Sequence, residues 1–467
     1  MGKEKSFLQQ ALMLIGSNMA TGLLGFIYST ILSRKVGPEG MGLYGLIFPV
    51  NSLLLSVITG GMMVAITKVI AEYYHQKDYL AIRKTIGITL FFNLMVSLTL
   101  VVLTYSFSFQ ISLYIIKDIR TLYGLRLILI STIFMALSNT LKGYFIGTSQ
   151  VIIPACIDIG EKSVRILLLL IFFKRFTFKE TINLVTVSFL VFTLGELFSL
   201  IFLSLYYYYD TANKAAPPSP GKEGQKDSIF LKRDALYYLK RILTLSVPLM
   251  LSELLASSLY TVSSILIPRR LTAAGINYLD ALQLIGKFSS MSLQVIFFPM
   301  FIIGSINSLL VPDLTKKMAA KEYEAARRRI LAVIQIAFQI GLGISLICIA
   351  FGPHIGVLFY KRDDLGPYLR FLAYLAPLFY LSAISRGILN GLGKQKALLR
   401  NTLLISALED LLIYLLIAIP SLNIFGMGIA MGISASVTIA INYREIHRTI
   451  PLLPLKGKKG QSITYAT

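Results

Sequence analysis

Long apolar runs separated by short polar segments dominate the sequence. About twelve runs are each roughly 20 to 25 residues long, enough to cross about 30 Å of hydrocarbon as a helix. The strands of a membrane β-barrel would instead alternate over about ten residues. The pattern predicts an all-α integral membrane protein with about 12 transmembrane helices. The predicted spans are residues 7–33, 43–67, 85–108, 121–145, 150–173, 184–208, 242–267, 281–310, 330–352, 366–390, 398–419 and 424–442.

The composition agrees with this membrane class. The chain has 467 residues, of which 55% are hydrophobic and 15% charged, and a mean hydropathy of +0.71. A net charge of +22 would suggest nucleic acid for a soluble protein. Here the cations lie mostly between apolar runs, so we expect anionic membrane lipids as partners and no nucleic acid. Cys156 and Cys348 lie inside apolar runs, which indicates packing and neither a disulfide nor a metal site.

The distribution of Lys and Arg among the loops predicts the orientation. Alternate loops differ strongly in their content of these residues, and the richer set is expected on the cytoplasmic side. Both termini are then cytoplasmic. The N-terminus runs into the first span without a cleavage site of the A-x-A kind, so we expect a retained first helix.

The longest polar insertion separates two groups of six spans. Residues 210–234 are rich in Pro, Gly, Lys and Ser, which is typical of a disordered linker. The expected parts are an N-terminal six-helix bundle, the cytoplasmic linker, a C-terminal six-helix bundle and a basic cytoplasmic tail, at residues 1–209, 210–234, 235–442 and 443–467.

Three pairs of short segments repeat between the two halves. The matches are 77–86 with 321–330 and 141–147 with 385–391, both at an offset of 244, and a third at an offset of 235 that pairs Asn18 with Glu253 and Arg34 with Arg269. Transporters are often built from related helical halves. Three matches in the same order therefore predict two pseudo-repeated six-helix bundles of like orientation.

Several of these segments also resemble a known family. The stretches "ILSRKVGPEGMGLYGLIFPV", "ITKVIAEYYHQKDYLAIRKTI" and "LIPRRLTAAG" are similar to the stage V sporulation protein B branch of polysaccharide exporters. That branch belongs to the multidrug/oligosaccharidyl-lipid/polysaccharide (MOP) exporter superfamily, with multidrug and toxin extrusion (MATE) transporters and lipid II flippases. The resemblance implies two bundles around a central cavity. It also implies alternating access and transfer of an undecaprenyl-pyrophosphate-linked saccharide to the outer leaflet of a bacterial cell membrane.

The fifth span carries the densest group of charges. Asp158, Glu161, Lys162 and Arg165 are spaced by three and four residues, which places them on one face of a helix. We expect Asp158 to reach Lys162 and Glu161 to reach Arg165. The stripe is either a self-paired structural seam or a cavity wall, whose cations bind pyrophosphate or whose carboxylates take a coupling ion.

Other acids lie deep in spans of the second half. Glu409 and Asp410 lie in the eleventh span at a depth that corresponds to the stripe, and Glu253 lies in the middle of the seventh. Such carboxyl groups are candidates for ion coupling, because desolvation favours their protonated form. Pairing with a cation on a neighbouring helix is the alternative.

A lipid pyrophosphate would need cations inside or at the ends of the spans. Its clustered oxygens match Arg forks and Lys ammonium groups. The pyrophosphate candidates are Arg34, Arg165, Arg269, Arg270 and Lys287. Interfacial snorkelling is the alternative for Arg34 and the default for Arg126 and Arg370. Lys142 and Arg386, beside the repeated glycines, are expected to anchor the cytoplasmic interface.

Glycine and proline inside spans are candidates for hinges. Gly60, Gly61, Pro299 and Gly304 can kink a helix, although close helix packing is the commoner cause of such residues.

Three function classes remain after these observations. The first is a flippase for a lipid-linked oligosaccharide, in peptidoglycan, other polysaccharide or spore-cortex synthesis, with cell-wall synthases as expected partners. The second is an ion-coupled multidrug or organic-cation antiporter of the same superfamily. A membrane enzyme is the third, and the loops offer no constellation for it. The chain has no P-loop, so we expect no cofactor and transport coupled to Na⁺, H⁺ or the membrane potential.

Overall fold

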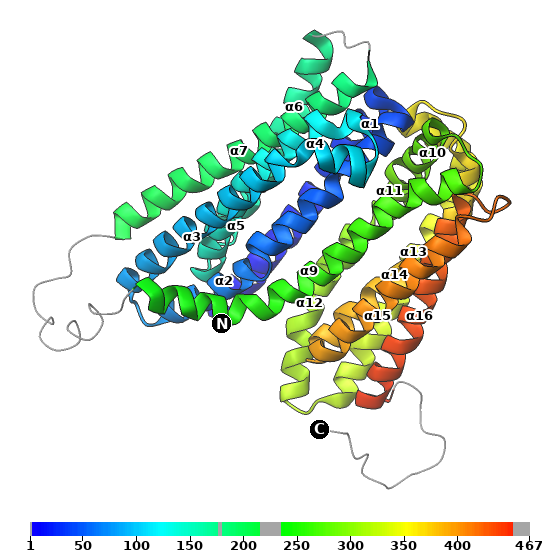
Figure 1. Ribbon diagram of the computed structural model, residues 1–467. Helices are drawn as coiled ribbons and strands as arrows, with labels where there is room; N and C mark the ends of the chain where they lie inside the picture. The colour runs from blue at the N-terminus through cyan, green and yellow to red at the C-terminus, as the bar shows by residue number, and fades with distance from the viewer. Residues whose placement is uncertain (1, 176–179, 215–234, 452–467) are drawn as a thin grey trace, which may run out of the picture. The chain divides into compact units, whose positions relative to one another are not determined.

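Helices make up all the regular structure that is described. The computed structural model describes residues 2–175, 180–214 and 235–451, and every regular element there is helical (Figure 1). The predicted all-α fold is therefore confirmed. The helices are α1 (Gly2–Thr59), α2 (Met62–His75), α3 (Tyr79–Ser106), α4 (Ser108–Gln110), η1 (Ile111–Ile116), η2 (Ile119–Thr121), α5 (Leu122–Gly147), α6 (Ile152–Arg175), α7 (Thr181–Lys214), α9 (Ala235–Ala273), α10 (Tyr278–Ile285), η3 (Gly286–Ser292), α11 (Leu293–Phe297), α12 (Met300–Ala319), α13 (Tyr323–Tyr360), α14 (Gly366–Gly391), α15 (Gln395–Leu416) and α16 (Phe425–Thr449).

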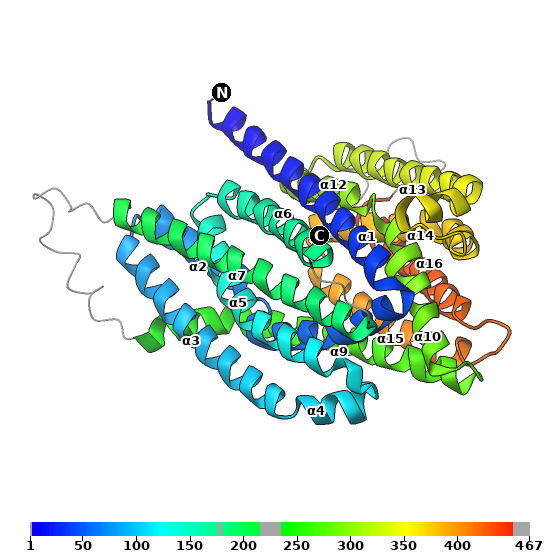
Figure 2. The ribbon, with the colours of Figure 1, turned by 90° about the horizontal axis from the view of Figure 1, so that it is seen from above.

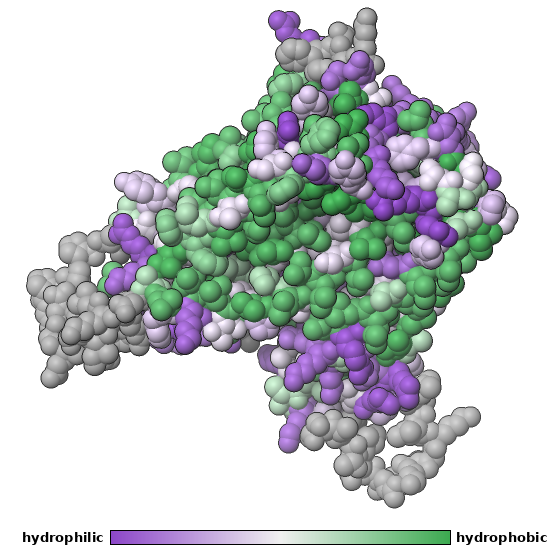
Figure 3. All heavy atoms as spheres, in the orientation of Figure 1, coloured by the Kyte–Doolittle hydropathy of each residue, from purple (hydrophilic) through white to green (hydrophobic). Residues whose placement is uncertain are grey.

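Many of these helices are suited to a bilayer. Among the described residues, eight are long and apolar enough to cross a membrane, or nine if the bent pair Tyr278–Phe297 and Met300–Ala319 forms one span. One of the eight, Gly16–His75, runs through α1 and α2 and covers two predicted spans. α6 and α15 also coincide with predicted spans but carry more charged residues. On the face drawn in Figure 3, hydrophobic residues cover the middle of the helices and hydrophilic residues gather at their ends.

The chain forms two compact units that do not follow the sequence order strictly. One unit contains Met1–Ser17 and Leu46–Thr261, and the other contains Asn18–Gly45 and Val262–Thr467. The middle of α1 therefore belongs with the C-terminal helices, and the first two thirds of α9 with the N-terminal ones. The domain limits expected from the sequence stay a prediction, and residues 215–234 and 452–467 of the expected linker and tail lie outside the described residues.

Two of the expected polar segments begin as helix. α7 continues into the expected linker as far as Lys214, and α16 continues into the expected tail as far as Thr449. In α7, Asp210 accepts hydrogen bonds from the Tyr144 hydroxyl at 2.5 Å and from the Gln150 amide at 3.2 Å. These bonds tie the end of α7 to α5 and to the loop after it.

Glycines allow equivalent close helix contacts in the two units. α5 packs on α2, and α14 packs on α12, beside α13 and α16 (Figure 2). A Cβ atom on Gly147 would lie 2.8 Å from Ile70, and one on Gly391 would lie 3.1 Å from Leu314. Both pairs are related by the predicted offset of 244 residues. Small residues let helix backbones approach where lipid gives no hydrophobic driving force, so the duplication extends to the packing contacts.

Three breaks in the long helices occur at glycine or proline. Gly37 has φ 74° and ψ 174° inside α1, and Gly61, with φ 66°, separates α1 from α2. These backbone conformations favour glycine, because a Cβ atom is disfavoured at positive φ. Pro299 separates α11 from α12, where the paired helices bend by 50°. The breaks thus coincide with two of the predicted hinge residues, and the hinge role itself stays a prediction.

Candidate functional site

The N-terminal unit contains a buried group of charges centred on Arg165. One Nη atom of Arg165 lies 2.5 Å from Glu161 of the same helix and 2.5 Å from Glu196 of α7, and the Arg165 side chain is only 4% exposed. Its guanidinium also lies over the Phe192 ring, 4.0 Å from the centroid. Burial of such an ion pair is tolerated only with this kind of close compensation. The expected contact between Glu161 and Arg165 is confirmed.

The helix that faces Arg165 provides room for it through a glycine. A Cβ atom on Gly195 would lie 2.5 Å from Cγ and from Nε of Arg165. Any larger residue would therefore push the arginine away. Gly195 and Glu196 together form the seat of this side chain on α7, and neither was predicted from the sequence.

Two lysines extend the charge group. Lys162 lies 3.3 Å from Glu161, and Lys142 of α5 lies 2.7 Å from Asp158. The expected contact between Asp158 and Lys162 is wrong, because Asp158 pairs across to α5 instead of along its own helix. Lys142 thus has a carboxylate partner, where the sequence suggested an interfacial anchor. The group contains three cations and three carboxylates and is close to neutral.

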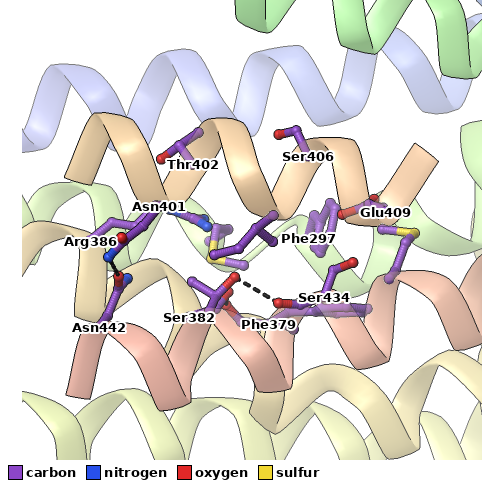
Figure 4. A pocket seen from close by; sticks show the side chains of 15 residues that line it. Phe297, Phe379, Ser382, Arg386, Asn401, Thr402, Ser406, Glu409, Ser434 and Asn442 are labelled. Carbon is purple, nitrogen blue, oxygen red and sulfur yellow. Dashed lines mark hydrogen bonds between the residues drawn. The ribbon is translucent and has the colours of Figure 1, made fainter. Parts of the chain in front are cut away.

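The C-terminal unit contains a cavity between helices that polar and apolar side chains line together. Its volume is about 190 Å³, and its lining comes from α11, α12, α14, α15 and α16 (Figure 4). Asn401 donates a hydrogen bond to Asn442 at 3.1 Å, and Asn442 donates one to Ser385 at 3.0 Å. Arg386 and Glu409 both line the cavity. Among the residues that the structure describes, Arg386 makes neither an ion pair nor a hydrogen bond, and Glu409 is the acid that acts on it electrostatically.

The two neighbouring acids of α15 have different surroundings. Glu409 lines the cavity, whereas Asp410 accepts a hydrogen bond from the Ser263 hydroxyl of α9. The second carboxylate oxygen of Asp410, Oδ2, is buried, and within the described parts of the chain it has no hydrogen-bond partner. An unsatisfied buried oxygen is costly, so Asp410 remains a candidate for taking a proton or a cation.

The predicted pyrophosphate cations of the C-terminal unit each have separate surroundings. Arg34 donates hydrogen bonds to the carbonyl oxygens of Phe359 and Leu358, near the C-terminal end of α13. A cation is favourable there because it offsets the negative end of the helix dipole. Arg270 donates a 2.9 Å hydrogen bond to the Tyr414 carbonyl and lies over the Tyr414 ring, whereas Arg269 is exposed.

Lys287 has a partner outside the membrane spans. Its ammonium group lies 2.8 Å from Asp364, which also binds Arg362 at 2.6 Å in the loop between α13 and α14. The hydrogen bond from Arg362, with a smaller effect of Lys287, lowers the pKa of Asp364 to about 2. The sequence suggested a deep position for Lys287, but its charge is directed to a loop at the end of a helix pair.

The remaining candidates lie at helix breaks and close contacts. Glu253 is exposed in α9, near the backbone of Gly61. A Cβ atom on Gly60 would lie 2.9 Å from Met250 Cα, so close packing of α9 requires a glycine there. Gly304 has open space around its Cα and lines a cavity beside Arg386. The roles of these residues in coupling and bending stay predictions.

Comparisons with known sequences give relatives along nearly the whole chain. The family model described as polysaccharide biosynthesis protein matches residues 7–318, and the MatE model matches residues 248–415. Stage V sporulation protein B of Bacillus subtilis (strain 168) is 24% identical over 450 residues, which cover 96% of this chain and 85% of the relative. Sporulation protein YkvU of the same organism is 23% identical over 438 residues, which cover 91% of this chain and 92% of the relative.

Solved structures with the same fold are transporters. An inward-facing multidrug resistance MATE family transporter of the MOP superfamily matches with a TM-score of 0.73 and 17% identity, over 93% of this chain and 98% of that one. An outward-facing multidrug resistance MATE family transporter matches with a TM-score of 0.64 and 16% identity, over 94% of this chain and 95% of that one. A MOP superfamily transporter from Pyrococcus furiosus is described as having a binding pocket of reverse polarity. It matches with a TM-score of 0.63 and 17% identity, over 94% of this chain and 95% of that one. The chain therefore has the fold of MATE and MOP transporters.

Proposed function

Because the chain belongs to the polysaccharide biosynthesis protein family, we propose that it moves a saccharide linked to undecaprenyl pyrophosphate from the inner to the outer leaflet of a bacterial cell membrane. It is a multi-pass membrane transporter of the MOP superfamily. The proposed substrate is a lipid II-like peptidoglycan precursor or another polysaccharide unit. Similarity to two sporulation proteins supports a role in cell-wall or spore-cortex synthesis.

The observation that carries this proposal is the position of Arg165 between Glu161 and Glu196. Phosphate oxygens and carboxylates bind a guanidinium in the same forked geometry. A pyrophosphate can therefore take the place of a carboxylate on Arg165. Lys142 and Lys162 supply further positive charge in the same group. The exchange leaves carboxylates that protons or Na⁺ can neutralise, which would couple transport to an ion gradient or to the membrane potential.

The proposal includes the orientation and the partners of the protein. Both termini are cytoplasmic, as the distribution of Lys and Arg favours. The lipid-linked oligosaccharide enters from the inner leaflet, alternating access exposes it to the outer side, and cell-wall synthases consume it there. Anionic lipids contact the many cations between the spans.

One observation favours a second function, an ion-coupled multidrug or organic-cation antiporter. Asp410 has a buried oxygen without a hydrogen-bond partner among the described residues, and an acid of this kind can bind a proton or a cation. The match of the MatE model to residues 248–415 includes this position. The Arg165 guanidinium favours the flippase, since it can bind phosphate oxygens and offers no acceptor to a cationic drug.

The first test is native mass spectrometry of the purified protein with undecaprenyl-pyrophosphate disaccharide-pentapeptide, competed by undecaprenyl phosphate and by a cationic dye. We expect selective binding of the pyrophosphate lipid, and at least tenfold weaker binding by Arg165→Gln, because a charge-assisted hydrogen bond is lost. Arg126→Gln is the matched control. Arg126 contacts Ser108 and the Tyr105 ring, away from the charge group.

Transport is then measured in proteoliposomes with a fluorescent derivative of the same lipid. Wild type and Arg126→Gln should move it, and Arg165→Gln should not. Thermal melting in detergent checks that Arg165→Gln is folded, with Arg165→Lys as a second variant that keeps the charge. Preference for the dye would reject the flippase and favour the antiporter. Wild-type lipid transport by folded Arg165→Gln would show that Arg165 does not bind the substrate.

A further inference from the structure

Internal duplication gives Arg386 a counterpart whose charge is compensated. At the offset of 244 residues, Arg386 corresponds to Lys142, which pairs with Asp158 at 2.7 Å. The alignment is supported by the helix ends, since α5 ends at Gly147 and α14 at Gly391. The position that corresponds to Asp158 is Thr402, a residue without charge. The substitution explains why Arg386 lacks an ion pair within the described chain.

A second difference at the same offset places an acid in the cavity. Glu409 corresponds to Arg165, so the charge at this position is reversed between the two units. Arg386 and Glu409 line the same cavity of about 190 Å³. In Figure 4 they lie toward opposite ends of the cavity, with Asn401, Ser406 and Ser434 between them. The cavity therefore has one positive end, one negative end, and both polar and apolar side chains between them.

This arrangement selects a small ligand with an anionic group and several hydroxyls. An arginine inside a span without a direct ion-pair partner is costly, and an anion from a ligand would provide that partner. The amides of Asn401 and Asn442 can both donate and accept hydrogen bonds, and the Glu409 carboxylate accepts them. Drug-sized ligands usually occupy about 300 to 1,000 Å³, so this cavity suits a fragment of the transported molecule.

From these features we infer that the cavity binds a single acidic sugar residue of the transported saccharide, with the sugar carboxylate on Arg386 and sugar hydroxyls on Glu409 and the asparagines. This inference rests on the proposed function and adds a saccharide subsite in the C-terminal unit. Phe297 and Phe379 also line the cavity and offer apolar surfaces to the ring carbons. A pyrophosphate is disfavoured, because Glu409 would repel its higher negative charge.

The test uses the absence of tryptophan from the chain. Phe297→Trp places a single fluorophore in the cavity, and Met431→Trp provides a second reporter if the first variant does not fold. The full-length protein in detergent is titrated with D-glucuronic acid, D-glucose and inorganic pyrophosphate. The first probe has the carboxylate, the second lacks it, and the third carries only phosphate charge.

We expect a saturable fluorescence change with D-glucuronic acid in the millimolar range, and at least tenfold weaker binding of the other two probes. Adding Arg386→Gln should weaken the binding of D-glucuronic acid by at least about tenfold, because a hydrogen bond to a charged group is lost. Arg400→Gln is the matched control on α15. Its side chain is exposed and pairs with Glu445 at 3.2 Å, so binding should stay within twofold of wild type.

The opposite results would overturn the subsite. They are no saturable change in either reporter, equal binding of D-glucose, tighter binding of pyrophosphate, or no effect of Arg386→Gln in a folded protein. Native mass spectrometry with the complete lipid-linked disaccharide separates the two proposals. If wild type binds that lipid while the sugar titrations fail, the subsite is rejected and the flippase stands; if wild type does not bind the lipid, the proposed function itself fails.

Discussion

Arg165 of α6 and Glu196 of α7 form a buried ion pair of 2.5 Å between two helices that follow each other in the chain. Glu161 shares the same guanidinium at 2.5 Å, so two carboxylates contact one arginine. A buried carboxylate without its partner is strongly destabilising. The contact between α6 and α7 therefore depends on charge balance as well as on shape.

Replacing Glu196 tests that dependence. Glu196→Gln removes one of two acids beside Arg165, and we expect the protein to lose about 1 to 3 kcal/mol of stability, since Glu161 retains part of the compensation. Thermal melting in detergent and the rate of lipid transport are the measurements. Glu180→Gln is the control, because Glu180 is exposed before α7 begins. Equal melting temperatures for both variants would show that the ion pair is not stabilising.

A methyl group on α7 should displace Arg165. In Gly195→Ala the new Cβ would lie 2.5 Å from two atoms of the arginine side chain. We expect lower thermal stability and weaker binding of the pyrophosphate lipid. Gly87→Ala in α3 is the matched change, because no atom lies within 4 Å of its added Cβ. It should be neutral or stabilising by about 0.5 to 1 kcal/mol, as expected for alanine in a helix. Normal lipid binding by Gly195→Ala would remove Arg165 from the binding site.

Acid should weaken the loop between α13 and α14. Arg362, and to a lesser extent Lys287, lower the pKa of Asp364 from 3.8 to about 2. A carboxyl group with a lowered pKa stabilises the folded state above its unfolded pKa, and the effect disappears as the pH falls from about 4 to about 2. Asp364 is partly exposed, so we expect about 1 kcal/mol.

The corresponding measurement compares wild type with Asp364→Asn. At pH 6 the wild type should melt at the higher temperature, and the two curves should converge near pH 2. A constant difference across this range would mean that the Asp364 carboxylate does not stabilise the loop. Asp363→Asn, at the preceding position, shows the effect of a general loss of negative charge.

An acid at position 402 should block sugar binding at the proposed subsite. Thr402→Asp places a carboxylate at the position that corresponds to Asp158, where it can pair with Arg386 as Asp158 does with Lys142. We expect at least about tenfold weaker binding of D-glucuronic acid in the tryptophan assay, because the anion site is already occupied. Thr402→Asn has a similar size without the charge and should bind normally. Unchanged binding by Thr402→Asp would argue against a carboxylate on Arg386.

The sequence predicted the helices well because each hydrophobic span is a local property of the chain. It also predicted the contact between Glu161 and Arg165, since residues four apart meet on one helix. It did not predict Glu196, a single acid in the apolar stretch "FTLGELFSL". The adjacent Gly195 was a usable signal, because a glycine beside a buried charge makes room for a large partner.

Contacts between distant helices explain the remaining differences. Asp158 pairs with Lys142 and Lys287 with Asp364, and neither spacing corresponds to neighbours on one helix. Helix orientation decides such pairs, and hydrophobic periodicity is weak in helices that are apolar all round. Packing between distant helices also decides which compact unit a segment joins. The middle of α1 joins the C-terminal helices, and the first two thirds of α9 join the N-terminal ones.

The equivalent contacts of Gly147 with Ile70 and of Gly391 with Leu314 have a consequence for how the protein diverged. The duplicated halves share this backbone spacing, whereas Asp158 and Arg165 of one half correspond to Thr402 and Glu409 of the other. Helix packing and buried charge therefore vary independently between the halves. Under the proposed function, one lobe would bind the common lipid pyrophosphate and the other a sugar residue, so substitutions around Arg386 would change the saccharide preference without altering the helix packing.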